Sequence, residues 1–160
     1  MNDNGLQIGE GVIIENELDR YGAYASVTRG VSMRPLFKTH RDVVVVKKCD
    51  GELRKYDVAL YRSPTGSYVL HRVIKVLPDT YLIRGDNTFV IEKVPKNRII
   101  GILSEFNRKG KQYTVNGTGY KIYSRLWNFL YPLRKLLFIL KRFLHRLYRV
   151  IFKKKEKSNK

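Results

Sequence analysis

The sequence predicts a mainly β protein that ends in a basic, amphipathic helical tail. Between residues 27 and 116, short runs rich in Val, Ile, Leu and Tyr alternate with turn signals, which is typical of a compact antiparallel sheet or a partly closed β-barrel. After residue 116, leucines recur every three or four positions, the spacing that lines one face of a helix. Positive charge gathers there too: the chain carries +18 overall, and residues 120–160 contain 13 of its 32 Lys and Arg residues but one acid, Glu156.

Six strands are predicted within this β domain, 27–116. Turn signals such as Asp50-Gly51 and Pro78-Asp79 separate them. Their ranges are 43–46, 57–62, 67–77, 80–85, 98–106 and 111–115.

Residues 1–26 are expected to form an N-terminal segment in which 7–21 make a short helix. Gly9 and Gly11 weaken that helical pattern. The segment is acidic and lacks the basic start and the long apolar stretch of a signal peptide.

The helical region, 117–153, is expected to be amphipathic. Pro132 should break it, kink it or start a second helix. No apolar run in it approaches the roughly 20 residues that a membrane-spanning helix needs. Residues 154–160, KKEKSNK, are expected to be a disordered basic tail.

Three partners are compatible with this tail. An interfacial membrane helix needs an apolar face with aromatic residues, a Lys/Arg face and few acids, and region 120–155 has all three. This pattern favours peripheral attachment to an anionic membrane surface, on a side that the sequence does not indicate. A helix packed on its own domain or on a second copy is the next alternative. Nucleic acid is not expected, because the aromatic residues join an apolar stripe rather than a basic groove.

The stretch RGVSMRPLF, residues 29–37, contains a candidate nucleophile, Ser32. A serine hydroxyl attacks poorly until a neighbouring base accepts its proton. Of the three histidines, His145 lies in the cationic tail and His40 at an expected turn. His71 lies in the middle of the strand-like run YVLHRVIKV, a rigid support for a base. Asp86, in the turn Gly85-Asp86-Asn87, and Glu92 offer carboxylates to orient the imidazole.

This ordered set of motifs resembles the signal peptidase I and LexA-like serine peptidase superfamily. The resemblance covers residues 27–106 and includes RGVSMRPLF, DVALYR, YVLHRVIKV, YLIRGDN and RIIGIL. It implies the β fold of that superfamily, with Ser32 as nucleophile. The HRV motif at 71–73, followed by GDN at 85–87, is similar to the histidine type found in the endoplasmic reticulum and in archaea. His71 would then be the general base, supported by Asp86 and Glu92.

Two positions depart from the superfamily's pattern. Gly30 stands where signal peptidases carry a serine that helps the oxyanion hole, so backbone N–H groups, including that of Ser32, would form the hole instead. Glu92 stands where an aspartate is usual. We expect Met33 and neighbouring apolar residues to line a groove that takes an extended peptide.

The sequence therefore predicts a membrane-associated serine endopeptidase. Its expected substrate is a peptide or protein with a signal- or leader-like segment. Asp86, with Glu92 assisting, is expected to orient His71. The alternatives are a catalytically altered peptide- or membrane-binding module of the same fold and, third, a basic nucleic-acid-binding protein. No residue indicates a metal or an organic cofactor.

Overall fold

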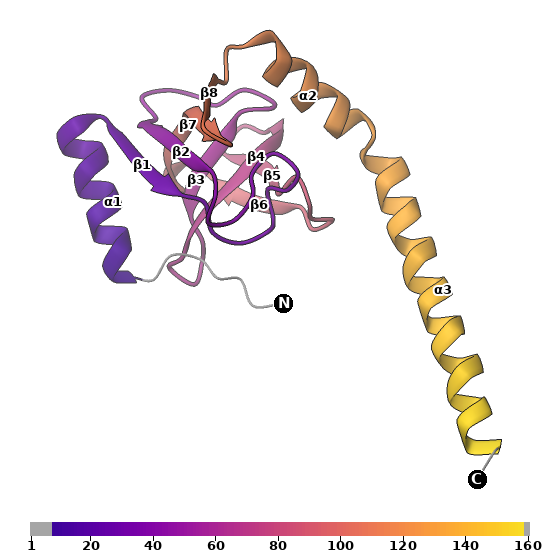
Figure 1. Ribbon diagram of the computed structural model, residues 1–160. Helices are drawn as coiled ribbons and strands as arrows, with labels where there is room; N and C mark the ends of the chain where they lie inside the picture. Colours follow the sequence, from indigo (N-terminus) through magenta and orange to yellow (C-terminus); the bar gives the residue numbers. More distant parts are fainter. Residues whose placement is uncertain (1–7, 159–160) are drawn as a thin grey trace. The chain divides into compact units, whose positions relative to one another are not determined.

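The computed structural model describes the backbone of residues 8–158 and the side chains of residues 14–149 (Figure 1). The predictions for residues 1–7 and 159–160 lie outside the described residues. The chain divides into two units, Met1–Arg125 and Leu126–Lys160, which are described separately below.

The first unit contains an antiparallel sheet of eight strands in the order β1-β2-β7-β3-β4-β5-β6, with β8 paired to β7. The six predicted strands are confirmed, and β1 and β6 are additional. Within the described residues β1 and β6 end the sheet without pairing to each other, so the sheet is open and not a closed barrel. The strands are β1 Ala23–Val27, β2 Val43–Lys48, β3 Val58–Arg62, β4 Tyr68–Val76, β5 Thr80–Arg84, β6 Glu92–Pro95, β7 Ile99–Arg108 and β8 Lys111–Thr114, with a 3-10 turn, η1, at Lys96–Arg98.

Helix α1, Ile8–Tyr21, confirms the predicted N-terminal helix. Ile14 and Leu18 lie on one face of it and are fully buried against Val46 of β2 and Leu60 of β3. The helix ends at Tyr21, and the next residue, Gly22, has a φ of 70°, the left-handed conformation that glycine adopts easily after a helix. Strand β1 begins at Ala23, so the sheet starts four residues before the predicted start of the β domain at residue 27.

The segment that carries Ser32 is anchored in the hydrophobic core by the residues that follow the serine. Met33, Leu36 and Phe37 are buried in a cluster with side chains of β2, β3 and β7. The ring of Phe37 meets that of Phe106 edge-on, at 5.3 Å between centroids. This packing fixes an otherwise irregular segment, because side chains in a close-packed core have few alternative positions.

Two helices follow β8: α2, Thr118–Phe129, and α3, Tyr131–Ser158. Of the outcomes expected at Pro132, the structure shows a second helix start. Proline is suited to a first helical turn, where its missing N–H has no intrahelical partner in any case. The first unit extends to Arg125, past the predicted boundary at 117, and α3 continues through 154–158, where disorder was expected. Within the described residues, no helix combines the length and the apolar content that a membrane span requires.

Candidate active site

His71 lies on β4, a strand paired on both sides, with β3 and with β5. His71 pairs with Ala59 of β3, and the residue is only 5% exposed. A central strand gives the imidazole little freedom to move. The predicted base is therefore held on a rigid, buried element.

Two groups contact Nδ1 of His71, the hydroxyl of Tyr61 and Oε1 of Glu92, each at 3.2 Å. Tyr61 donates its hydroxyl proton to Oε2 of Glu92 at 2.8 Å, so its oxygen is left as an acceptor toward the imidazole. Because both neighbours of Nδ1 then act as acceptors, the ring proton belongs on Nδ1. In the neutral imidazole the other nitrogen, Nε2, then carries a lone pair and no proton.

The carboxylate of Glu92 is charged in this arrangement. Its hydrogen bond with His71 lowers the pKa of Glu92, and the bond from Tyr61 lowers it further, against the opposing effect of partial burial. Glu92 is the first residue of β6 and pairs with Ile83 of β5. A negative charge fixed beside Nδ1 orients the ring and would stabilise the imidazolium formed when Nε2 takes a proton.

Nε2 of His71 is the one buried side-chain nitrogen or oxygen with no hydrogen-bond partner among the described residues. Such groups are rare in folded proteins, and a catalytic role is one of the explanations for them. A Cβ atom placed on Gly85 would lie 3.0 Å from this Nε2 and 3.1 Å from Cβ of Ser32. The candidate base and the candidate nucleophile therefore flank the same point of the backbone.

The loop that carries Ser32 is bound to the turn after β5. The N–H of Asn87 donates to the carbonyl oxygen of Ser32 at 2.7 Å, and its side-chain amide donates to the carbonyl of Val31 at 3.3 Å. Gly85 approaches so closely that an added Cβ would lie 2.7 Å from that same carbonyl oxygen of Ser32. The GDN turn thus holds the nucleophile loop in register with His71.

Gly30 has a φ of 73°, a conformation that a serine adopts only with strain, and its carbonyl accepts a hydrogen bond from Thr39. The glycine is therefore required by the loop's path. Within residues 8–158 the N–H of Ser32 donates to no acceptor, which leaves it available to an oxyanion.

Two sequence expectations need correction. Asp86 does not bond to the imidazole of His71: it forms a two-point ion pair with Arg72, and Glu92 supplies the carboxylate that contacts the ring. The physical reason is strand alternation, because His71 and Arg72 are neighbours on β4 and face opposite sides of the sheet. Met33 does not line an open groove, since its side chain is 7% exposed and packs in the core.

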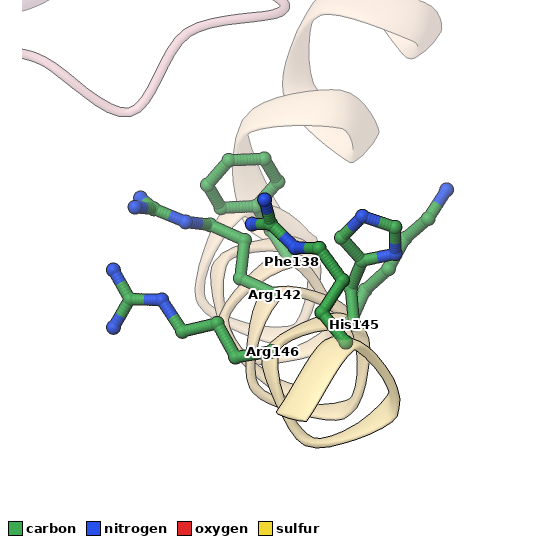
Figure 2. Close-up of a pocket in the computed structure, with 6 residues that line it drawn as sticks. Phe138, Arg142, His145 and Arg146 are labelled. Atoms are coloured by element: carbon green, nitrogen blue, oxygen red, sulfur yellow. The ribbon is translucent and has the colours of Figure 1, made fainter. Parts of the chain in front are cut away.

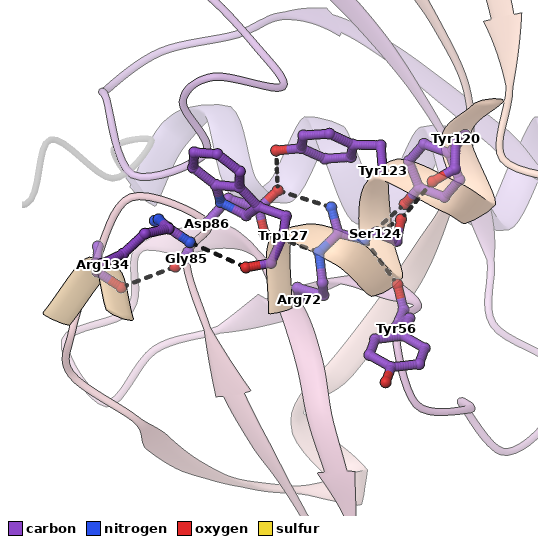
Figure 3. Close-up of polar contacts among 10 residues, drawn as sticks. Tyr56, Arg72, Gly85, Asp86, Tyr120, Tyr123, Ser124, Trp127 and Arg134 are labelled. Atoms are coloured by element: carbon purple, nitrogen blue, oxygen red, sulfur yellow. Dashed lines mark hydrogen bonds and ion pairs between the residues drawn. The ribbon is translucent and has the colours of Figure 1, made fainter. Parts of the chain in front are cut away.

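The residues that sequence reasoning missed are Tyr61, Arg72 and the α2 residues that contact the Arg72–Asp86 pair (Figure 3). Tyr61 lies two residues from Ala59 along β3, on the same face as His71, so its place depends on strand register. Arg72 had a signal, because it stands beside His71 within the HRV motif.

The other two histidines are both exposed. His40 is exposed, in a turn with a φ of 58°. His145 is exposed on α3, in the second unit, beside an open hollow lined by Phe138 and by Lys141, Arg142, Arg146 and Arg149 (Figure 2).

Comparison with known proteins adds no family to these observations. No model of a known protein family matches the chain, and no curated protein matches it at a significant level.

Proposed function

We propose that this chain is a serine endopeptidase of the signal peptidase and LexA-like type. The observation that carries the proposal is the buried Nε2 of His71, which has no hydrogen-bond partner among the described residues and lies beside Gly85 as Ser32 does, while Nδ1 is held by Glu92. A base of this kind is what a serine needs to become a nucleophile. The resemblance of the ordered motifs from RGVSMRPLF to RIIGIL supports the same reading.

The proposed reaction proceeds in two halves. Oγ of Ser32 bonds to a peptide carbonyl carbon while its proton passes to Nε2 of His71. The N–H of Ser32 stabilises the negative oxygen of the tetrahedral intermediate. The carbon–nitrogen bond then breaks, and His71 gives its proton to the leaving amine. Water, deprotonated by the same Nε2, hydrolyses the acyl-serine ester and restores the hydroxyl.

The proposed substrate is a peptide with an apolar, signal- or leader-like segment. The resemblance implies this class, and exposed apolar side chains next to the site support it. Val31 precedes Ser32 and is 51% exposed, while Val90 and Ile91 precede Glu92 and are 69% and 47% exposed.

The test is cleavage of a peptide pool. We expect the purified protein to cut peptides that carry an apolar segment followed by small residues, and the fragments to be visible by mass spectrometry. Ser32→Ala should produce none, because no other group at the site can form the acyl intermediate. Peptides that are retained but stay intact with the folded wild-type protein would overturn the peptidase and favour the altered binding module.

We further propose that α3 attaches the protein to an anionic membrane surface. Leucines on one side of the helix are between 42% and 62% exposed, namely Leu133, Leu136, Leu137, Leu140, Leu144 and Leu147. The hollow on α3 in Figure 2 presents five basic or histidine side chains. No acid occurs between Glu105 and Glu156 to neutralise them. An apolar face opposite a cationic one is suited to lying in a lipid interface.

Charge removal on α3 should weaken binding to vesicles. Each basic residue near an anionic surface contributes about 1 kcal/mol, so replacing Arg142, Arg146 and Arg149 together by Gln should lower partitioning roughly a hundredfold. Sedimentation with phosphatidylcholine vesicles, with and without phosphatidylserine, measures this. The matched control replaces three exposed lysines of the first unit, Lys75, Lys93 and Lys111, by Gln. Equal losses in both triple variants, or binding that ignores phosphatidylserine, would refute the α3 surface.

A further inference from the structure

Arg72 is a fully buried charged side chain directly next to the candidate base, and its exposed fraction is 0%. Its Nε and Nη2 donate to the two carboxylate oxygens of Asp86, each at 2.8 Å. Burial by itself would lower the pKa of Arg72, and the attraction of Asp86 outweighs it, so the pKa is raised. Arg72 therefore keeps its charge inside the protein, where a charge is costly unless it is paired and its hydrogen bonds are made.

Further bonds to the pair come from the backbone carbonyl of Tyr56, which accepts from Nη1 of Arg72 at 2.9 Å, and from the first turns of α2 (Figure 3). Nη1 of Arg72 donates to the hydroxyl of Tyr120 at 3.1 Å and to Oγ of Ser124 at 3.0 Å. Tyr123 donates its hydroxyl to Asp86 at 2.9 Å. These three residues share one face of the helix, at the spacing i, i+3, i+4. Ser124 is itself only 2% exposed.

Each member of the ion pair is adjacent in sequence to a residue of the candidate site. Arg72 follows His71 on β4, and Asp86 follows Gly85, which lies against the backbone of Ser32. Asn87, the next residue, donates to the carbonyl of Ser32. Any shift of Asp86 would therefore move the backbone that holds the nucleophile, while a shift of Arg72 would move the base.

We propose that Tyr120, Tyr123 and Ser124 of α2 are positioning residues for the Ser32–His71 pair, an inference that rests on the proposed peptidase function. They act by completing the bonds of the buried Arg72–Asp86 pair, which ties β4 to the GDN turn. A misplacement of about 1 Å in a catalytic group costs on the order of a hundredfold in rate. The N-terminal half of α2 thus supports the candidate active site, and this role does not depend on whether α3 binds lipid.

The test compares Tyr123→Phe and Ser124→Ala with Ile122→Ala, a control on the same helix whose side chain is 59% exposed. We expect each of the first two variants to lower kcat about tenfold to a hundredfold with KM nearly unchanged, and the control to match the wild type. All assays are run without vesicles, so that membrane binding plays no part. Tyr120→Phe, which keeps the ring and loses one acceptor, is the alternative if Ser124→Ala does not fold.

The ring nitrogens of His71, observed by ¹⁵N NMR without substrate, give a readout independent of cleavage. We expect their shifts to move in Tyr123→Phe and to stay at wild-type values in Ile122→Ala. A folded Tyr123→Phe with unchanged kcat and unchanged His71 shifts would overturn the inference, even if its thermal midpoint fell. If the wild type cleaves nothing, the peptidase proposal fails, while the shifts still decide whether α2 positions His71.

Discussion

Glu92→Gln is expected to lower kcat about a thousandfold to ten-thousandfold while leaving the fold intact. The neutral amide removes the charge that stabilises the imidazolium and offers an N–H where Oε1 now accepts the proton of Nδ1 at 3.2 Å. If the amide donates to Nδ1, the ring proton moves to Nε2, and the base can no longer take the proton of Ser32. Steady-state cleavage of one peptide measures the loss.

Glu52→Gln is the matched control, because Glu52 is an exposed carboxylate paired with Lys96 and lies outside the site. It should retain wild-type kcat. A Glu92→Gln protein that cleaves at the wild-type rate would show that Glu92 does not support the base.

Glu92→Gln should also have a measurable, pH-dependent effect on the stability of the fold. The folded pKa of Glu92 lies below the ordinary 4.5, mainly because of the hydrogen bond with His71. Its contacts therefore stabilise the fold above that pH, and this contribution is lost as the pH falls through the folded pKa. The gap in thermal midpoint between wild type and Glu92→Gln should be present at neutral pH and shrink below about pH 4. A gap that does not change with pH would contradict the depressed pKa.

Gly85→Ala is expected to reduce cleavage by at least about a hundredfold. The new Cβ would lie 2.7 Å from the carbonyl oxygen of Ser32, a distance that real Cβ atoms essentially never show. It would also lie 3.0 Å from Nε2 of His71, which is closer than most real Cβ contacts. The obstacle at 2.7 Å is backbone, which cannot swing aside as a flexible side chain would. The Ser32 loop must therefore move away from the GDN turn and from the base.

Gly51→Ala is the control for this substitution, since an added Cβ there meets nothing within 4 Å. We expect it to cleave as the wild type does. Thermal unfolding of both variants separates a displaced site from a general loss of the fold. Full activity in Gly85→Ala would mean that Ser32 and His71 do not need the close approach described here.

The strands that could be predicted are those with long apolar runs, such as VVVV in β2 and YVLHRVIKV in β4. The two that were missed, β1 and β6, are short edge strands of the sheet. β6 is only Glu92–Pro95, with two charged residues and a proline, so it lacks the apolar alternation that marks a strand. Its place is set by pairing with β5, which is a non-local interaction.

The residues of the candidate site could be predicted from the sequence, but the hydrogen bonds and ion pairs among them could not. Ser32 and His71 follow from the motifs, and the structure brings them to the same point at Gly85. The partner of each carboxylate depends on which face of a strand it meets, so Asp86 and Glu92 could not be assigned from spacing alone. The contribution of α2 required knowledge of how a segment some 50 residues downstream packs on Arg72.

The most direct measurement is the rate of cleavage of one peptide by Ser32→Ala, by His71→Ala and by the double variant. If Ser32 and His71 act as one unit, each single variant should lose about four orders of magnitude or more, and the double variant no more than the worse of the two. Circular dichroism should show all three folded. Losses that multiply in the double variant, or a Ser32→Ala protein that still cleaves, would contradict a serine activated by His71.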